Sequence, residues 1–163
     1  TLRVPERLSG GAVAVRRLAG EDPGWAGVLE LQEADNLAQE RPFLDYRTFA
    51  EQRIGEWRSL IGAGRGAWFV VEDAGAVVAS LGVIVTDGRA RYQAVDVAVS
   101  HRRRGIASHL VCAAAEMISA EWPVRQFVIA AVPDDPALGL YEALGFQRAE
   151  TVHGVFRRPV AGG

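Results

Sequence analysis

The chain has 163 residues, a formal net charge of −2 at pH 7, 49% hydrophobic residues and 23% charged residues. This length suits one domain that buries roughly 70% of its unfolded surface, and no apolar run approaches the ~18 residues that span a membrane. All 18 basic residues are arginines and Cys112 is the only cysteine, which excludes lysine-based phosphate loops, lysine general bases, internal disulfides and paired-cysteine zinc sites.

The chain start and the charge favour one soluble domain in the cytoplasm. Residues 1–10 lack a basic segment followed by an apolar stretch, so we expect no signal peptide. The small negative charge gives no electrostatic reason to expect nucleic acid as a partner, and no membrane partner is expected. We therefore predict a single domain over residues 1–163, with a core over about 11–158 and flexible ends at 1–10 and 159–163.

Apolar periodicity predicts the elements of the first half. Residues 11–18 are predicted as a strand and residues 22–39 as a helix. Residues 67–71 and 77–85 are rich in β-branched and aromatic residues, so they are expected to pair antiparallel across a short turn. Between the predicted first helix and this strand pair, apolar residues recur at helical spacing up to Gly62 and predict a second helix. These apolar residues are Tyr46, Phe49, Ala50, Ile54, Trp57, Leu60 and Ile61.

The next predicted strand covers residues 92–99 and alternates residue by residue. Val95, Val97 and Val99 fall on one face. The opposite face then holds Tyr92, Ala94, Asp96 and Ala98.

The second half continues with a helix that begins at Ile106 and ends before Pro123. Its predicted apolar stripe consists of Leu110, Ala113, Ala114, Met117 and Ile118. The apolar run 127–132 is expected to pair in parallel with the strand before this helix, because a helix connects the two. A short helix over 136–144, capped by Asp135, and two closing strands within 146–158 complete an α+β fold.

The start of the long helix predicts an anion site. Arg102, Arg103 and Arg104 precede Gly105, so no Ser, Thr, Asp or Asn is in place to accept hydrogen bonds from the first helical N–H groups. Such an end can bind a phosphate. The alternative is a solvated arginine loop, in line with the use of arginine for every positive charge.

Two motifs give the chain a recognisable resemblance. A strand ending in Asp96-Val97-Ala98-Val99 is followed by Arg102-x-x-Gly105-x-Ala107 at a helix start, and later by Leu140-Tyr141-Glu142-Ala143-Leu144-Gly145-Phe146. This arrangement resembles the GNAT superfamily of acyl-CoA-dependent N-acetyltransferases. The resemblance implies a mixed central sheet of about seven strands, mostly antiparallel, with a splayed parallel pair in the middle and about four flanking helices.

The resemblance also implies a cofactor site for acetyl-CoA, without a metal. The pyrophosphate would lie on backbone N–H groups of the loop and the helix start, with the Ser108 side chain nearby. The residues that would supply these N–H groups are Arg102, Arg103, Arg104, Gly105, Ile106 and Ala107. The pantetheine arm would pair with exposed backbone of the strand at Val97, Ala98 and Val99, as an added strand does. An N–H of that strand could stabilise the oxyanion that forms on the acetyl carbonyl.

The implied catalytic residues are Tyr141 and Asp96. Tyr141 matches a tyrosine that protonates the departing thiolate in many members of the superfamily, and we favour this role over the alternative of a core aromatic residue. Ile129 stands where some members carry a glutamate, so the base must be sought elsewhere. Asp96 is the leading candidate for the base because it is an acid within an apolar strand. The alternatives are that Asp96 has only a structural role, that Glu72 is the base, or that the amine is deprotonated through water.

The acceptor side carries weaker signals. The first helical region holds Glu21, Asp22, Glu30, Glu33, Asp35 and Glu40 and no basic residue. This could form an acidic rim that attracts a cationic amine, or a solvated helix face. Tyr46, Trp57 and Trp68 could line an acceptor pocket or fill the core.

Together these observations predict an acetyl-CoA-dependent N-acetyltransferase. The acceptor would be a primary amine of a small molecule or peptide that attacks acetyl-CoA directly in a ternary complex. One alternative is a catalytically silent acyl-CoA-binding or regulatory domain, and another is a phosphate-binding module based on the arginine run. A homodimer is expected only by analogy with the superfamily.

Overall fold

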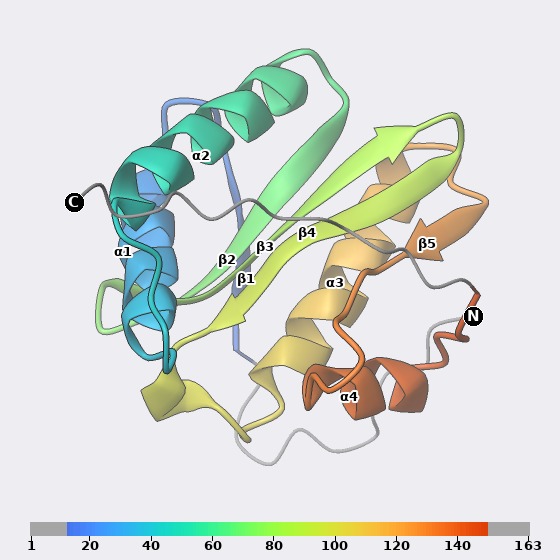
Figure 1. Cartoon of the computed structure of the whole chain (residues 1–163). Coiled ribbons are helices and arrows are strands. Elements are labelled where there is room, and N and C mark those ends of the chain that lie inside the picture. Colours follow the sequence, from blue (N-terminus) through green and yellow to red (C-terminus); the bar gives the residue numbers. More distant parts are fainter. Residues whose placement is uncertain (1–12, 150–163) are drawn as a thin grey trace.

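The structure is a computed structural model that describes residues 13–149. Its elements follow one another along the chain as β1 (Val15–Leu18), α1 (Gly24–Leu37), α2 (Tyr46–Gly62), β2 (Gly66–Asp73), β3 (Ala76–Thr86), β4 (Arg89–Val97), the 3₁₀ turn η1 (Val99–His101), α3 (Ile106–Glu121), β5 (Gln126–Val128) and α4 (Ala137–Ala143). The α+β class predicted from the sequence is confirmed (Figure 1).

The strands form one sheet in the order β1-β2-β3-β4-β5 within the described residues. The pairs up to β4 are antiparallel, and β4 and β5 run parallel, as predicted. The parallel pair lies at one edge of this five-stranded sheet, whereas about seven strands were expected. Most of the predicted closing region, 146–158, lies outside the described residues, as do the predicted ends 1–10 and 159–163, and residues 146–149 form no strand.

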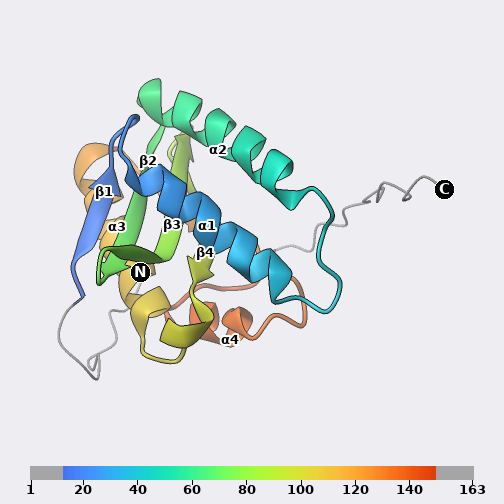
Figure 2. The same cartoon turned by 90° about the vertical axis from the view of Figure 1, so that its left-hand side faces the viewer.

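Helices cover both faces of the sheet (Figures 1 and 2). The α1–α2 side holds a core of Leu18, Trp25, Val28, Ile54, Trp57, Trp68 and Val70. The α3 side holds the larger core, which includes Phe69, Val71, Leu81, Leu110, Val111 and Ile118. Because β2 is buried on both faces, it reads as a continuous apolar run and not as an alternating one.

One predicted stripe position on α3 is wrong. Met117 is 39% exposed, while Val111, Cys112 and Ala115 are buried. The buried face of α3 is therefore rotated toward Val111 and Ala115 and away from Met117. The short helix α4 agrees with its prediction, because Asp135 accepts a hydrogen bond from the N–H of Ala137 (2.8 Å).

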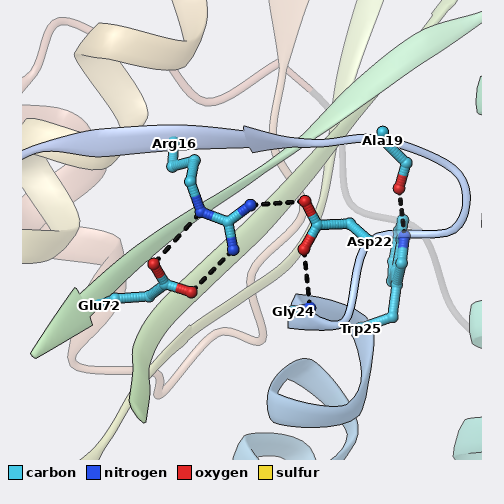
Figure 3. Close-up of polar contacts among 6 residues, drawn as sticks. All are labelled: Arg16, Ala19, Asp22, Gly24, Trp25 and Glu72. Carbon is cyan, nitrogen blue, oxygen red and sulfur yellow. Dashed lines mark hydrogen bonds and ion pairs between the residues drawn. The ribbon is translucent and has the colours of Figure 1, made fainter. Parts of the chain in front are cut away.

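A network of polar contacts fixes the start of α1 against the sheet (Figure 3). Arg16 on β1 contacts both carboxylate oxygens of Glu72 on β2 and also pairs with Asp22. Asp22 in turn accepts a hydrogen bond from the N–H of Gly24 (2.8 Å), and Arg16 holds the pKa of Asp22 below its usual value. The helix thus begins where β1 and β2 lie side by side.

Trp68 is the centre of the core on the α1–α2 side. Its ring lies 4.6 Å from that of Trp57 and 5.3 Å from that of Trp25, measured between centroids. Its indole N–H donates to the Ser80 hydroxyl (2.7 Å), which satisfies the buried polar atom. Of the two sequence readings of Trp68, pocket or core, the core reading is therefore the correct one.

Two glycine substitutions should have opposite effects on stability. A Cβ at Gly82 would lie 2.2 Å from the Trp68 ring, whereas a Cβ at Gly55 on α2 would meet nothing within 4 Å. We expect Gly82→Ala to lower the free energy of unfolding by about 1–3 kcal/mol through overpacking. Gly55→Ala should raise it by about 0.5–1 kcal/mol, because alanine favours the helix. Urea denaturation of both variants tests this, and equal effects would contradict the packing described.

Candidate active site

The parallel pair separates soon after it begins. Only Arg89, Ala90 and Arg91 of β4 pair with β5, through Gln126, Phe127 and Val128. The predicted strand 127–132 is correspondingly short, and residues 129–132 form no strand. From Tyr92 onward β4 has no β5 partner, so the splay implied by the resemblance is confirmed (Figure 1). Among residues 13–149 no other strand pairs with this edge of β4, which we call the open edge.

A β-bulge in β4 changes the faces that the sequence predicted. Ser80 on β3 pairs with Asp96 and Gly82 pairs with Gln93, so β4 contains one residue more than β3 between these pairs. Ala94 takes up the extra length with a left-handed φ of 42°. The strict alternation predicted for 92–99 is therefore wrong: Tyr92 and Ala98, which were expected on the opposite face, belong to the same core as Val95 and Val97.

The bulge brings Asp96 to the α1–α2 side of the sheet. Alternation from Tyr92 without the bulge would direct Asp96 into the apolar core beneath α3. With the extra residue, Asp96 and Ala94 line a pocket on the opposite face. The local backbone geometry therefore converts a buried strand position into a pocket position.

The open edge of β4 is centred on Val97. The N–H of Ala98 donates to the Val78 carbonyl (2.8 Å), so the neighbouring residue Val97 directs its own N–H and C=O away from β3. Val99 does not continue the strand, contrary to the prediction, because it begins η1 and is 61% exposed. Of the three predicted backbone positions, only Val97 faces the open edge as a strand residue.

The N-terminus of α3 has the uncapped form predicted from the sequence. Gly105 adopts a left-handed φ of 76° and no described side chain caps the helix, whereas Asp22 and Asp135 serve α1 and α4. The side chains of Arg103 and Arg104 are exposed and make no ion pair within residues 13–149.

The third arginine of the run has a structural role. Arg102 donates to the Val97 carbonyl (3.0 Å) and pairs with Asp35 on α1. It thereby ties the helix over the pocket to the end of β4. Two of the three arginines are left for an external anion, together with the backbone from Gly105 to Ser108.

The pocket on the α1–α2 side has a volume of about 220 Å³. It is lined by residues of α1, α2 and β4: Gln32, Tyr46, Phe49, Ala50, Arg53, Trp57, Ala94 and Asp96. Tyr46 and Trp57 are the two aromatic residues that the sequence proposed for this role. A larger hollow of about 410 Å³ lies along the β3–β4 hairpin and contains none of the predicted site residues.

Asp96 is an unusual acid in this pocket. Its Oδ2 atom is buried without a hydrogen-bond partner among the described residues, and so is Nε2 of the neighbouring Gln32. Burial and, to a smaller extent, Asp35 raise the pKa of Asp96 to about 6, although Gln32 and Arg102 act in the opposite direction. Such a group is ionised at neutral pH and can take up a proton readily.

Tyr141 lies on α4 and is buried, with 6% of its surface exposed. It packs edge-on against Phe146, with the ring centroids 6.1 Å apart. Burial raises the pKa of its hydroxyl to about 12, with further contributions from Asp135 and Asp96. Tyr141 belongs to the core beneath α3 and is not among the residues that line the pocket of Asp96, which lies on the α1–α2 side of the sheet.

The other candidates have partners elsewhere. Arg16 holds Glu72 at the start of α1, so Glu72 is not part of the pocket. Four of the six acids in the predicted rim are paired with arginines: Glu21 with Arg58, Asp22 with Arg16, Glu33 with Arg47 and Asp35 with Arg102. This pairing favours the reading of a solvated helix face over that of an acidic rim.

Gln32 on α1 and Arg53 on α2 also line the pocket but were not predicted from the sequence. The repetition of Phe49, Arg53 and Trp57 every four residues on α2 is the signal that places an arginine beside aromatic side chains. No group of His, Cys, Asp or Glu in residues 13–149 is arranged to hold a metal ion, and none of the helices there is long and apolar enough to cross a membrane.

The raised pKa of Asp96 makes stability depend on pH. Because the folded pKa of about 6 exceeds the ordinary value of 3.8, the protonated acid favours the folded state and this contribution is lost as the pH rises through 6. The free energy of unfolding of Asp96→Asn, taken relative to that of the wild type, should therefore rise by about 2–3 kcal/mol as the pH increases from 4 to 8. Urea denaturation across this range measures the difference, and a constant difference would contradict the burial of the carboxyl.

Comparisons with known proteins agree with this geometry. Residues 64–148 match the family described as the acetyltransferase (GNAT) domain, and a search of curated proteins gave no match. The solved structures with similar folds include the aminoglycoside acetyltransferase AAC(6')-Iy with a bisubstrate analogue (TM-score 0.68, 16% identity, covering 91% of this chain and 100% of that one).

Two further similar structures differ in their described roles. One is an aminoglycoside acetyltransferase from an uncultured soil metagenomic sample in complex with sisomicin (TM-score 0.69, 19% identity, covering 89% of this chain and 95% of that one). The other is a transcriptional regulator from Bacillus halodurans C-125 (TM-score 0.70, 19% identity, covering 90% and 100%). At these identities the likeness shows the fold, while the family match covers the splayed strands, the arginine loop and α4. The chain belongs to the GNAT family of acetyltransferases.

Proposed function

We propose that the chain is one catalytic domain that transfers an acetyl group from acetyl-CoA to a primary amine of a small molecule or peptide, by direct attack in a ternary complex. The observation that carries this proposal is the position of Asp96. It lies in a pocket on one face of β4, next to Val97 at the open edge of the same strand. An amine in the pocket and an acyl donor along that edge would meet at this point of the strand.

The residues of the loop before α3 fit an acyl-CoA. When bound, acetyl-CoA supplies the activated acetyl thioester. The uncapped N–H groups from Gly105 to Ser108, with Arg103 and Arg104, offer donors and positive charge to its phosphates. Val97 offers an outward N–H to the open edge of β4, while its carbonyl already accepts a hydrogen bond from Arg102.

Asp96 and Tyr141 have pKa values that suit opposite proton transfers. Asp96, with a pKa of about 6, is ionised at neutral pH and would accept a proton from the incoming ammonium group, directly or through an intervening water molecule. Tyr141, with a pKa of about 12, keeps its proton at neutral pH and would donate it to the leaving thiolate. Two groups with separated pKa values are the pattern expected of an acid and a base in one site.

Acyl transfer itself is tested by the release of free thiol from acetyl-CoA in the presence of amines, with a control that lacks amine. We expect release above the control with at least one class of amine among amino acids, peptides, polyamines and aminoglycosides. Demonstrated binding of acetyl-CoA without any amine-dependent release would contradict the proposal and favour an acyl-CoA-binding regulatory domain.

Asp96→Asn tests the base. The variant should lose about a hundredfold in kcat/KM, since general bases contribute on this scale. The wild-type profile of kcat/KM should fall below about pH 6, where the Asp96 carboxylate becomes protonated, and the variant should lack this acid limb. A variant that retains both the rate and the limb would show that another group or water accepts the proton.

Tyr141→Phe tests the acid and keeps the ring that packs against Phe146. We expect kcat to fall by about a hundredfold or more because the thiolate leaves without a proton. A thermal unfolding midpoint close to that of the wild type serves as the control for folding. Full turnover with an unchanged pH profile would assign Tyr141 to packing alone.

A further inference from the structure

The pocket beside Asp96 contains a positive group that the proposed reaction does not use. Arg53 on α2 lies over the Trp57 ring at 5.0 Å and over the Phe49 ring at 5.7 Å, measured from its guanidinium carbon to the ring centroids. It makes no ion pair within residues 13–149, although it lines the pocket. Stacking uses the flat face of a guanidinium group, so its N–H donors remain at the edge for an anion.

The nearby acids do not neutralise Arg53. Besides Asp96, two acids raise the pKa of Tyr46 in this pocket, Glu33 and Asp35. Glu33 is paired with Arg47, and Asp35 is paired with Arg102. Asp96 has a buried oxygen without a partner and is not joined to Arg53 by an ion pair. The pocket therefore presents one carboxylate and one guanidinium group that are separate from each other and lack described counter-ions.

We propose that the acceptor is a small zwitterion, whose amine meets Asp96 and whose anionic group, a carboxylate or a phosphate, meets Arg53. This inference rests on the proposed function and adds the class of acceptor to it. The pocket of about 220 Å³ is smaller than the roughly 300–1,000 Å³ of pockets for drug-sized ligands, which fits an acceptor of amino-acid size. A polycation such as an aminoglycoside would bring positive charge toward Arg53, which is unfavourable in a partly buried site.

Matched acceptors test the charge requirement. β-Alanine, 4-aminobutyrate and 6-aminohexanoate are each compared with the alkylamine of the same chain length, and O-phosphoethanolamine is compared with ethanolamine. At least one zwitterionic acceptor should exceed the matched amine that lacks the anionic group about tenfold or more in kcat/KM, as expected for a charged hydrogen bond. Comparing the carboxylate acceptors with the phosphate acceptor shows which anionic group Arg53 prefers. A preference for the amines without an anionic group, or for spermidine, would overturn the inference.

Substitutions test whether Arg53 is the residue responsible. Arg53→Gln should raise KM for the preferred zwitterionic acceptor about tenfold or more, with little effect on the matched amine that lacks the anionic group. Arg53→Lys should retain most of the preference, because the charge remains. Arg41→Gln removes the same charge from an exposed position outside the pocket lining and should change neither acceptor. Equal losses for both acceptors in Arg53→Gln would mean that Arg53 supports packing and does not select the substrate.

Calorimetric titration of the same acceptors in the presence of CoA separates the two proposals. Binding of a zwitterionic acceptor to the wild type but not to Arg53→Gln, without turnover of any amine, would retain the zwitterion site and reject acyl transfer. Turnover of amines that lack an anionic group, with no binding of any zwitterion, would retain acyl transfer and reject the zwitterion site.

Discussion

One additional residue in β4 determines what the rest of this fold can do. The left-handed backbone at Ala94 shifts every later side chain of the strand to the opposite face, so that Val95 and Val97 join the core beneath α3 and Asp96 enters the pocket. A non-glycine residue in this conformation costs about 1–2 kcal/mol. The surrounding packing of β3, α1 and α3 holds the strand in this form, and the bulge brings the proposed cofactor edge and the proposed acceptor pocket within a few residues of each other.

The divergence of β5 completes this arrangement. Parallel pairing ends at Arg91, so the backbone of β4 beyond it has polar groups that no described strand satisfies. Strand edges of this kind accept an added strand or an extended ligand. Arg102 links the two halves of the site, because it contacts both the Val97 carbonyl and Asp35 on the helix that covers the pocket.

Much of the fold follows from local sequence pattern. The apolar spacing from Tyr46 to Ile61 predicted α2, which spans Tyr46–Gly62, and the hairpin and the capped helix after Asp135 were predicted in the same way. The bulge was not predicted, because an alternating strand and a bulged strand differ by one residue whose effect depends on the partner strand. Met117 was wrongly predicted as buried for a related reason, since only the packed structure shows which face of α3 is covered.

Some features of the candidate site also stand out in the sequence, and others do not. Asp96 stood out as an acid in an apolar strand, and the arginine run stood out as a helix start without a cap. The pairing of the acidic residues on α1 and the stacking of Arg53 depend on contacts between helices, which spacing along one chain does not reveal. The proposed cofactor site, which would use backbone groups, therefore left a clearer signal in the sequence than the proposed acceptor pocket, whose side chains come from three elements.

The most direct test of this account is a titration of the Asp96 carboxyl carbon by NMR, with Asp96→Asn used to assign the signal. A carboxyl that the bulge has directed into the pocket should titrate with a midpoint of about 6, and binding of an amine should lower that midpoint because the ammonium group stabilises the carboxylate. A midpoint near the ordinary value of 3.8, unaffected by amines, would contradict both the burial of Asp96 and its proposed role.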